Sequence, residues 1–156
     1  MTAYQELETR FHRLYALRGA AGVLHWDMAS MMPAGGGADR AEQLAAVNVT
    51  CHEVLADPRL AELLERAEGE AGGLDSWQRA NLIEMRRQWT HATALDGRLV
   101  EALTKACAAC EGEWRKARAA ADYASILPAM GEVLALVREQ AAAKAAKLNQ
   151  IGRAHV

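Results

Sequence analysis

Histidine and aspartate, the usual side chains for acid–base chemistry, flank a tryptophan in the triplet His25-Trp26-Asp27. Consecutive residues of a helix point in different directions, so His25 and Asp27 cannot form a hydrogen-bonded pair by themselves. One interpretation makes the triplet a cluster that contacts substrate. In the other, Trp26 packs between helices while His25 and Asp27 bond to neighbouring segments. The residue types alone favour this second, structural role.

A glutamate follows a histidine at one place, the pair His52-Glu53. A catalytic zinc site of the His-Glu-x-x-His type needs a second histidine one helical turn after the first. Ala56 occupies that position. Because one imidazole cannot hold a catalytic zinc, we interpret His52 as a surface or helix-end residue.

Cys107 and Cys110 have the spacing of a redox pair or of half a zinc site. A redox pair opens a helix after a strand, where the helix N-terminus lowers the thiol pKa. This pair instead falls deep inside a predicted helix, in line with Leu103 and Trp114, and no second Cys or His pair at a plausible spacing completes a zinc site. We therefore interpret both residues, like Cys51, as buried and apolar. A small thiol or metal protein built on the pair is a weaker hypothesis.

A connector of Met32-Pro33 and the glycines at 35–37 interrupts the helical pattern. Arg40 and Gln43 follow it in the first turns of the next helix, from which both could reach back to the connector. A basic residue near a helix start is unfavourable for the helix dipole. We therefore expect Arg40 to have a carboxylate or carbonyl partner.

Helix-favouring residues and apolar residues at helical spacing dominate the rest of the chain. Predicted helices begin near Ala3, after Gly37, at Pro58, after Asp75 or Ser76, after Asp96 and near Pro128, the last of these preceded by a short helical turn at Asp122. Trp77, Trp89 and Trp114 are interpreted as packing between helices. Short connections favour antiparallel neighbours. The sequence thus predicts an all-α array of about six mostly antiparallel helices.

Composition restricts the possible partners and compartment. The 156 residues carry 18 basic and 20 acidic side chains, a formal net charge of −2, and show no basic patch for nucleic acid. Charged residues interrupt every apolar run, so no membrane span is predicted. The polar N-terminus does not resemble a secretory signal, and three cysteines without framework spacing suit a reducing compartment. We expect a cytoplasmic protein with neither nucleic acid nor membrane as partner.

Several short motifs follow one another in a fixed order. They are Tyr4-Gln5-Glu6-Leu7; His25-Trp26-Asp27 with Met32-Pro33 and Gly35-Gly36; Arg40-Ala41-x-Gln43-Leu44; Asp57-Pro58-Arg59-Leu60; and Trp77-Gln78-x-Ala80-Asn81-Leu82-x-Glu84-Met85-Arg86-Arg87. Together they resemble the N-terminal region of the carboxypeptidase Taq family of zinc metallocarboxypeptidases, up to about Asn149. The resemblance makes residues 1–150 the incomplete N-terminal helical segment of a larger all-helical, zincin-type peptidase domain.

The resemblance implies a cytoplasmic enzyme, usually a homodimer, that releases C-terminal amino acids from peptides. One divalent metal, zinc or in some members cobalt, activates water and polarises the scissile carbonyl while a glutamate handles the proton. In the family the His-Glu-x-x-His helix and the third ligand lie downstream of the matched segment, and the N-terminal helices look like part of the cover over a deep groove. No catalytic or metal-binding residue is therefore assigned here. The signature positions, cleft-lining or structural, are His25, Trp26, Asp27, Met32, Pro33, Arg40 and Gln43.

The last residues, 151–156, break the helical pattern with Ile-Gly-Arg-Ala-His-Val. One set of codons for them reads as a common sequencing-adapter run, so we expect a non-native tail on a gene model that was cut short. A different functional class is also open: a stand-alone helical protein-interaction module without catalysis. Such a finished module should not leave a large apolar patch uncovered.

Overall fold

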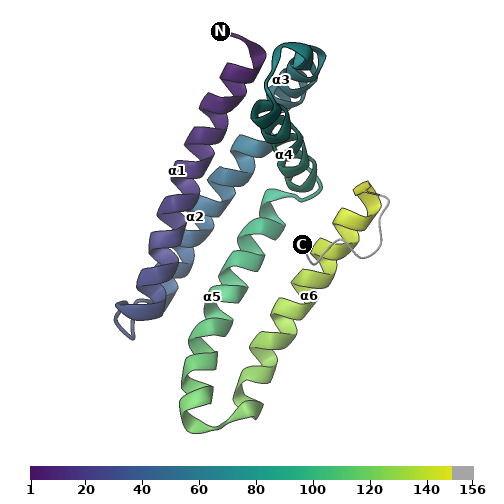
Figure 1. The fold of residues 1–156 in the computed structure, drawn as a ribbon. Coiled ribbons are helices and arrows are strands. Elements are labelled where there is room, and N and C mark those ends of the chain that lie inside the picture. Colours follow the sequence, from purple (N-terminus) through teal and green to yellow (C-terminus); the bar gives the residue numbers. More distant parts are fainter. Residues whose placement is uncertain (149–156) are drawn as a thin grey trace.

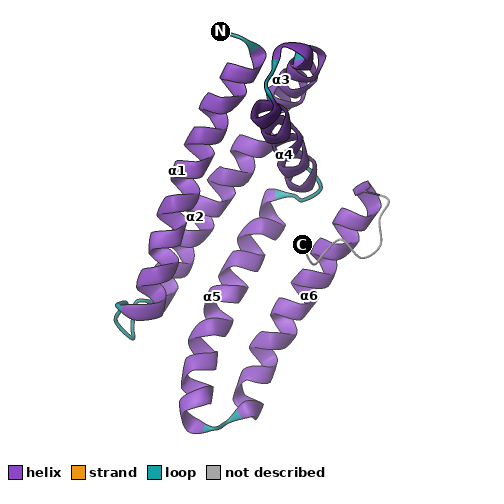
Figure 2. Ribbon diagram, viewed as in Figure 1, coloured by secondary structure: helices purple, strands orange, loops and turns teal. Residues whose placement is uncertain are grey.

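The computed structural model describes residues 1–148, which form six α-helices, one short 3-10 turn and no strand (Figures 1 and 2). The elements are α1 (Ala3–Ser30), α2 (Gly37–Ala56), α3 (Pro58–Gly69), η1 (Ala71–Gly73), α4 (Ser76–Ala92), α5 (Gly97–Ala120) and α6 (Tyr123–Leu148). The predicted all-α class is confirmed. None of these helices is long and apolar enough to cross a membrane. The expected tail, 151–156, lies outside the described residues.

The four long helices lie in a row in the order α1, α2, α5, α6, with each helix packed on the next (Figure 1). The shorter α3 and α4 cover the end of the row that holds the start of α1 and the end of α2, and α3 packs on α1 and on α4. Neighbours along the row run antiparallel, as predicted. The start of α2 meets the middle of α5 at the Glu42–Lys105 ion pair, whereas His52 near the end of α2 lies beside Gly97 at the start of α5, so the two helices run in opposite directions.

Side-chain caps fix several of the helix starts. Thr2 and Gln5 form a reciprocal capping box at α1, and Asp75 and Gln78 form another at α4. Asp96 accepts a 2.7 Å hydrogen bond from the backbone N–H of Leu99 at the start of α5. These caps use residues within three positions of each other, so the sequence could predict them.

The start of the last helix was predicted wrongly. A single helix, α6, begins at Tyr123 and runs through Pro128, because the Asp122 carboxylate accepts from the backbone N–H of Ser125 at 3.2 Å and caps the chain there. Pro128 lies inside the helix and lacks the N–H that would bond to Ala124 one turn earlier.

The main core cluster lies where α1, α2, α3 and α4 meet. Its buried residues are Ala3, Tyr4, Leu7, Leu14, Cys51, Leu55, Leu60, Leu63, Leu64, Ala67, Leu82 and Met85. Trp89 packs against this cluster, as interpreted from the sequence, but Trp77 is 80% exposed at the start of α4. The interpretation of Trp77 as a packing residue was therefore wrong for this chain. A second, smaller cluster joins Ala21 and Met28 of α1 to Leu44 of α2.

Asp57 joins three parts of the fold. It caps α3 by accepting from the backbone N–H of Arg59 at 3.0 Å, and it pairs with Arg10 of α1 at 3.1 Å. The Arg59 guanidinium, the Arg59 backbone N–H and Arg10 hold the pKa of Asp57 well below its usual range, against the smaller opposing effect of its partial burial.

Asp57→Asn is expected to weaken the acid sensitivity of folding. A depressed carboxyl pKa stabilises the native state above the unfolded-state pKa of about 3.9, and this stabilisation disappears as the pH falls below that value. Asparagine still caps a helix but does not titrate. The free-energy difference between wild type and variant, measured by urea unfolding, should therefore shrink between neutral pH and about pH 3. A constant difference over this range would contradict the assignment.

Candidate functional site

The signature region forms the corner between α1 and α2. The backbone N–H groups of Met31 and Met32 both donate to the Asp27 carbonyl, at 2.9 and 2.8 Å, and end α1. Gly36 then donates to the Pro33 carbonyl at 2.9 Å, which turns the chain into α2. A Cβ atom at Gly36 would lie 3.0 Å from Met32 Cγ and 3.3 Å from the Pro33 carbonyl oxygen. The tight turn therefore leaves little room for a larger residue at this position.

Arg40 ties this corner together. Its guanidinium Nη1 lies 2.6 Å from Asp27 Oδ2 and donates to the Leu24 carbonyl at 2.9 Å. Its Nε donates to Gln43 Oε1 at 2.9 Å. The expectation that Arg40 has a carboxylate or carbonyl partner is confirmed, because it binds one of each. Both partners lie in the last turns of α1 and not in the connector. The Arg40 and Asp27 side chains are 16% and 31% exposed, so solvent screens this pair only in part.

His25 and Trp26 do not join this network. Both are exposed, Trp26 to 62%. The expected packing of Trp26 between helices is therefore wrong for this chain. The reason is helical geometry: Trp26 stands two residues from both Leu24 and Met28, which face α2, so it points to about the opposite side of α1.

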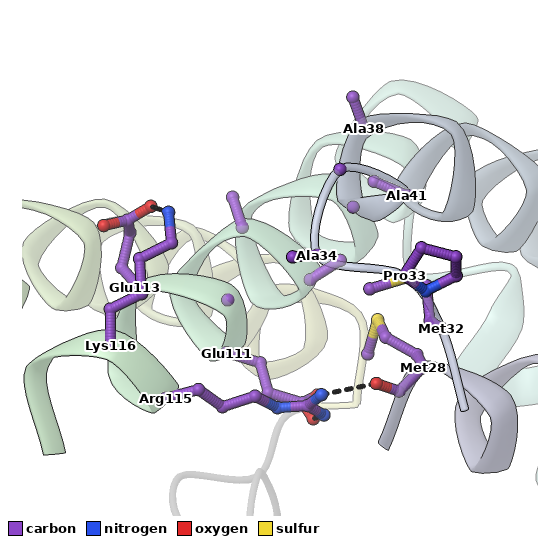
Figure 3. Close-up of a pocket in the computed structure, with 15 residues that line it drawn as sticks. Met28, Met32, Pro33, Ala34, Ala38, Ala41, Glu111, Glu113, Arg115 and Lys116 are labelled. Carbon is purple, nitrogen blue, oxygen red and sulfur yellow. Dashed lines mark hydrogen bonds and ion pairs between the residues drawn. The ribbon is translucent and has the colours of Figure 1, made fainter. Parts of the chain in front are cut away.

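A cavity of about 520 Å³ opens between the connector, the start of α2 and the middle of α5 (Figure 3). Two signature positions, Met32 and Pro33, line it from the connector. Small residues make much of the remaining wall: Ala34, Gly35, Gly37, Ala38, Ala41, Ala108, Ala109 and Gly112. On one side, Arg115 of α5 donates to the main-chain carbonyl of Met28, which ties α5 to α1 (Figure 3).

The charged residues of this cavity pair with one another. Arg115 pairs with Glu111, and Lys116 lies 2.8 Å from Glu113. No histidine or cysteine lies among the lining residues. The cavity therefore has the shape of a binding or packing site, without a nucleophile or a histidine for acid–base work.

The donor residues of the described chain do not fit a metal ion. Within residues 1–148 no group of three His, Cys, Asp or Glu side chains comes close enough together to hold one. His52 is half-buried near the end of α2, beside Gly97 of α5, and Glu53 is exposed. Residues 1–148 therefore offer no catalytic zinc site of the kind that needs three protein ligands.

The cysteines divide into two kinds. Cys51 is buried in the main core cluster, as interpreted. Cys107 is exposed and Cys110 is half-buried, so the interpretation of these two as buried was wrong; Ala106 and Ala117 occupy the buried face of α5. Partial burial of the thiol is the main cause that raises the pKa of Cys107, and the neighbouring Cys110 raises it further. A raised pKa opposes the thiolate that a redox cysteine requires.

Comparison with known proteins gives the family. The sequence matches the carboxypeptidase Taq (M32) metallopeptidase family over residues 6–151. The chain belongs to this family. The motif resemblance seen in the sequence is thereby confirmed, and the corner at Arg40 is part of the M32 region that the match covers.

Relatives within M32 are much longer than this chain. Thermostable carboxypeptidase 1 of Thermus thermophilus is 36% identical over 142 residues, and the protein of the same name from Pyrococcus furiosus is 23% identical over 137 residues. These alignments cover 89% and 88% of this chain but 28% and 27% of the relatives. The chain therefore spans little more than a quarter of the length of the curated M32 relatives it matches.

Solved M32 structures share the helical arrangement. Metallocarboxypeptidase 1 of Trypanosoma cruzi superposes with a TM-score of 0.70 at 34% identity, over 92% of this chain and 28% of that one. A structure of Pyrococcus furiosus carboxypeptidase also gives 0.70, at 22% identity over 92% and 29% of the two chains, a likeness that shows the fold. The six helices thus recur inside larger chains.

Local sequence patterns indicate one side of the cavity and not the other. The connector and α2 were singled out, whereas Arg115, Glu111 and the small residues of α5 were not. The signal available was the spacing of Ala108 and Gly112, four residues apart on one helical face, which allows another segment to approach closely. The sequence does not say which segment that is.

Proposed function

We propose that this chain is the N-terminal portion of a metal-dependent carboxypeptidase, which releases C-terminal amino acids from peptides by means of metal-activated water. The family match over residues 6–151 supports this proposal, together with the small share of the M32 relatives that the match covers. The complete protein would work as a cytoplasmic homodimer with zinc or cobalt, held by a His-Glu-x-x-His helix that the present sequence does not include. Residues 1–148 would supply scaffold.

The signature positions fit a structural role in such an enzyme. Arg40 bonds the first turns of α2 to Asp27 and the Leu24 carbonyl in the last turns of α1, and Gln43 accepts from Arg40 within α2. Met32 and Pro33 lie at the cavity, where they would shape the wall of the substrate groove or pack against the rest of the domain. The exposed His25 and Trp26 are then available to a segment outside the described chain.

The chain alone is expected to release no C-terminal amino acid from a peptide, with zinc or cobalt supplied. Its described residues offer no group that could hold a metal and activate water. Amino-acid release, followed by chromatography, checks this expectation. Release that a chelator abolishes would contradict it.

A chimera tests the proposed function itself. Residues 1–148 would replace the matching segment of the Thermus thermophilus relative. The rest of the chimera would be the unchanged remainder of that relative. A folded chimera should release C-terminal residues, and a chelator should stop the reaction. A chimera with a native circular-dichroism spectrum but no activity would count against the proposal.

The stand-alone interaction module receives less support. Leu127, Met130 and Leu134 of α6 are 46%, 44% and 48% exposed, and their spacing places them on one helical face. Monomeric proteins rarely leave such a contiguous apolar stripe uncovered. The stripe is more consistent with a piece of a larger fold.

A further inference from the structure

The first half of α6 is almost free of charge. From Tyr123 to Val137 the sequence contains one ionisable acid or base other than tyrosine, Glu132. Surface helices normally carry charged or polar residues on the face opposite their apolar stripe, whereas a helix that is apolar all round is buried. The sequence of α6 therefore fits a helix that is covered on more than one side.

Only one side of α6 is covered among the described residues. The helix stands at the end of the row and packs on α5, where Ile126 is 5% exposed (Figure 1). Leu127, Met130 and Leu134 lie beside the face that packs on α5, and each is close to half exposed. We call these three residues the α6 stripe. At the α5–α6 turn it adjoins a hollow lined by Trp114, Tyr123 and other residues.

Other exposed apolar side chains do not form a comparable surface. On α1, Tyr15, Val23 and Trp26 are exposed. Gly19 and Gly22 separate Tyr15 from the other two, so these side chains form no continuous stripe. Ile83 of α4 is 73% exposed between Asn81 and Glu84, which are also exposed. The α6 stripe is thus distinguished by continuity and by lack of charge, the two properties that mark an interaction surface.

We propose that the α6 stripe is a packing surface. The part of the M32 domain that lies outside this chain packs on it. The inference rests on the proposed function. The length of a relative supports this occupant: the helices keep their arrangement inside Trypanosoma cruzi metallocarboxypeptidase 1, of which the match covers 28%. The larger remainder of such a domain must meet these helices somewhere, and burial of the uncharged stripe gives the most favourable contact.

The test places one substitution in two contexts. Leu134→Glu is made in the chain alone and in the chimera with the Thermus thermophilus relative. In the chain alone, where Leu134 is half exposed, the melting temperature should change by no more than about 2 °C. In the chimera the carboxylate would be buried, and the melting temperature should fall by roughly 5 °C or more. Leu134→Ala adds no charge. It should lower the melting temperature of the chimera by less than Leu134→Glu does, and it should leave that of the chain alone unchanged.

Ile83→Glu is the matched control, because it also puts a carboxylate on an exposed helix position. It should leave the melting temperature within about 2 °C in both contexts. A Leu134→Glu effect no larger in the chimera than in the chain alone would overturn the proposal. So would a chain that sediments as a stable dimer and becomes monomeric with Leu134→Glu, because the stripe would then belong to a second copy.

The two proposals can fail separately. An active chimera that is indifferent to Leu134→Glu would leave the carboxypeptidase function standing and overturn the packing surface. A folded chimera that Leu134→Glu destabilises selectively, but that releases no amino acid, would support the packing surface and contradict the function.

Discussion

Replacing Leu64 with alanine is expected to lower the free energy of unfolding of the chain by about 2–5 kcal/mol. Leu64 is fully buried in α3, within the main core cluster, where α3 packs on α1 and α4. The substitution removes apolar contacts and leaves a cavity that the surrounding helices fill only in part. Typical domains have about 5–15 kcal/mol of stability in all, so this one change would remove a large share.

Urea unfolding followed by circular dichroism measures the Leu64→Ala effect. Ile83→Ala is the control, since Ile83 is 73% exposed and its truncation should cost less than about 0.5 kcal/mol. Equal effects of the two substitutions would show that the packing of α3 on α1 and α4 is not formed in solution.

Arg40→Leu is expected to destabilise the chain by about 1–3 kcal/mol, the second largest effect. The substitution removes the ion pair with Asp27 and the hydrogen bond to the Leu24 carbonyl, and it leaves the partly buried carboxylate without its partner. A loss near 3 kcal/mol would apply to a fully buried ion pair. Because the Asp27 side chain is 31% exposed, water can solvate the unpaired carboxylate and the loss of stability should be smaller.

A double-mutant cycle isolates the contact between Arg40 and Asp27. Arg40→Leu, Asp27→Asn and the double variant should show a coupling free energy of at least about 0.5 kcal/mol, because the two side chains interact directly. Arg13→Leu, at an exposed position of α1, is the control and should be nearly neutral. Additive effects of Arg40→Leu and Asp27→Asn would contradict the ion pair.

The starts of α1 to α5 were the most predictable part of the fold. Pairs such as Asp57-Pro58 mark a helix start with residues that are adjacent in the sequence, and the structure uses them as predicted. Burial was less predictable. Trp77 and Cys107 were expected inside but are exposed, because periodicity shows which residues share a helical face and not whether another segment covers that face.

The candidate site was predicted on one side only for a related reason. Arg40 lies close in sequence to Leu24 and Asp27, so a partner near the corner could be anticipated from the sequence. Arg115, by contrast, bonds to the carbonyl of Met28 across 87 positions of sequence. Such a contact depends on the order of helices in the row, and no local pattern encodes that order.

The main core cluster has a consequence for synthesis on the ribosome. All of its buried residues lie between Ala3 and Met85, and none comes from α5 or α6. The first four helices can therefore collapse onto one another while the following pair is still in the exit tunnel. The face of α2 that packs on α5 would then already be in place when α5 leaves the tunnel.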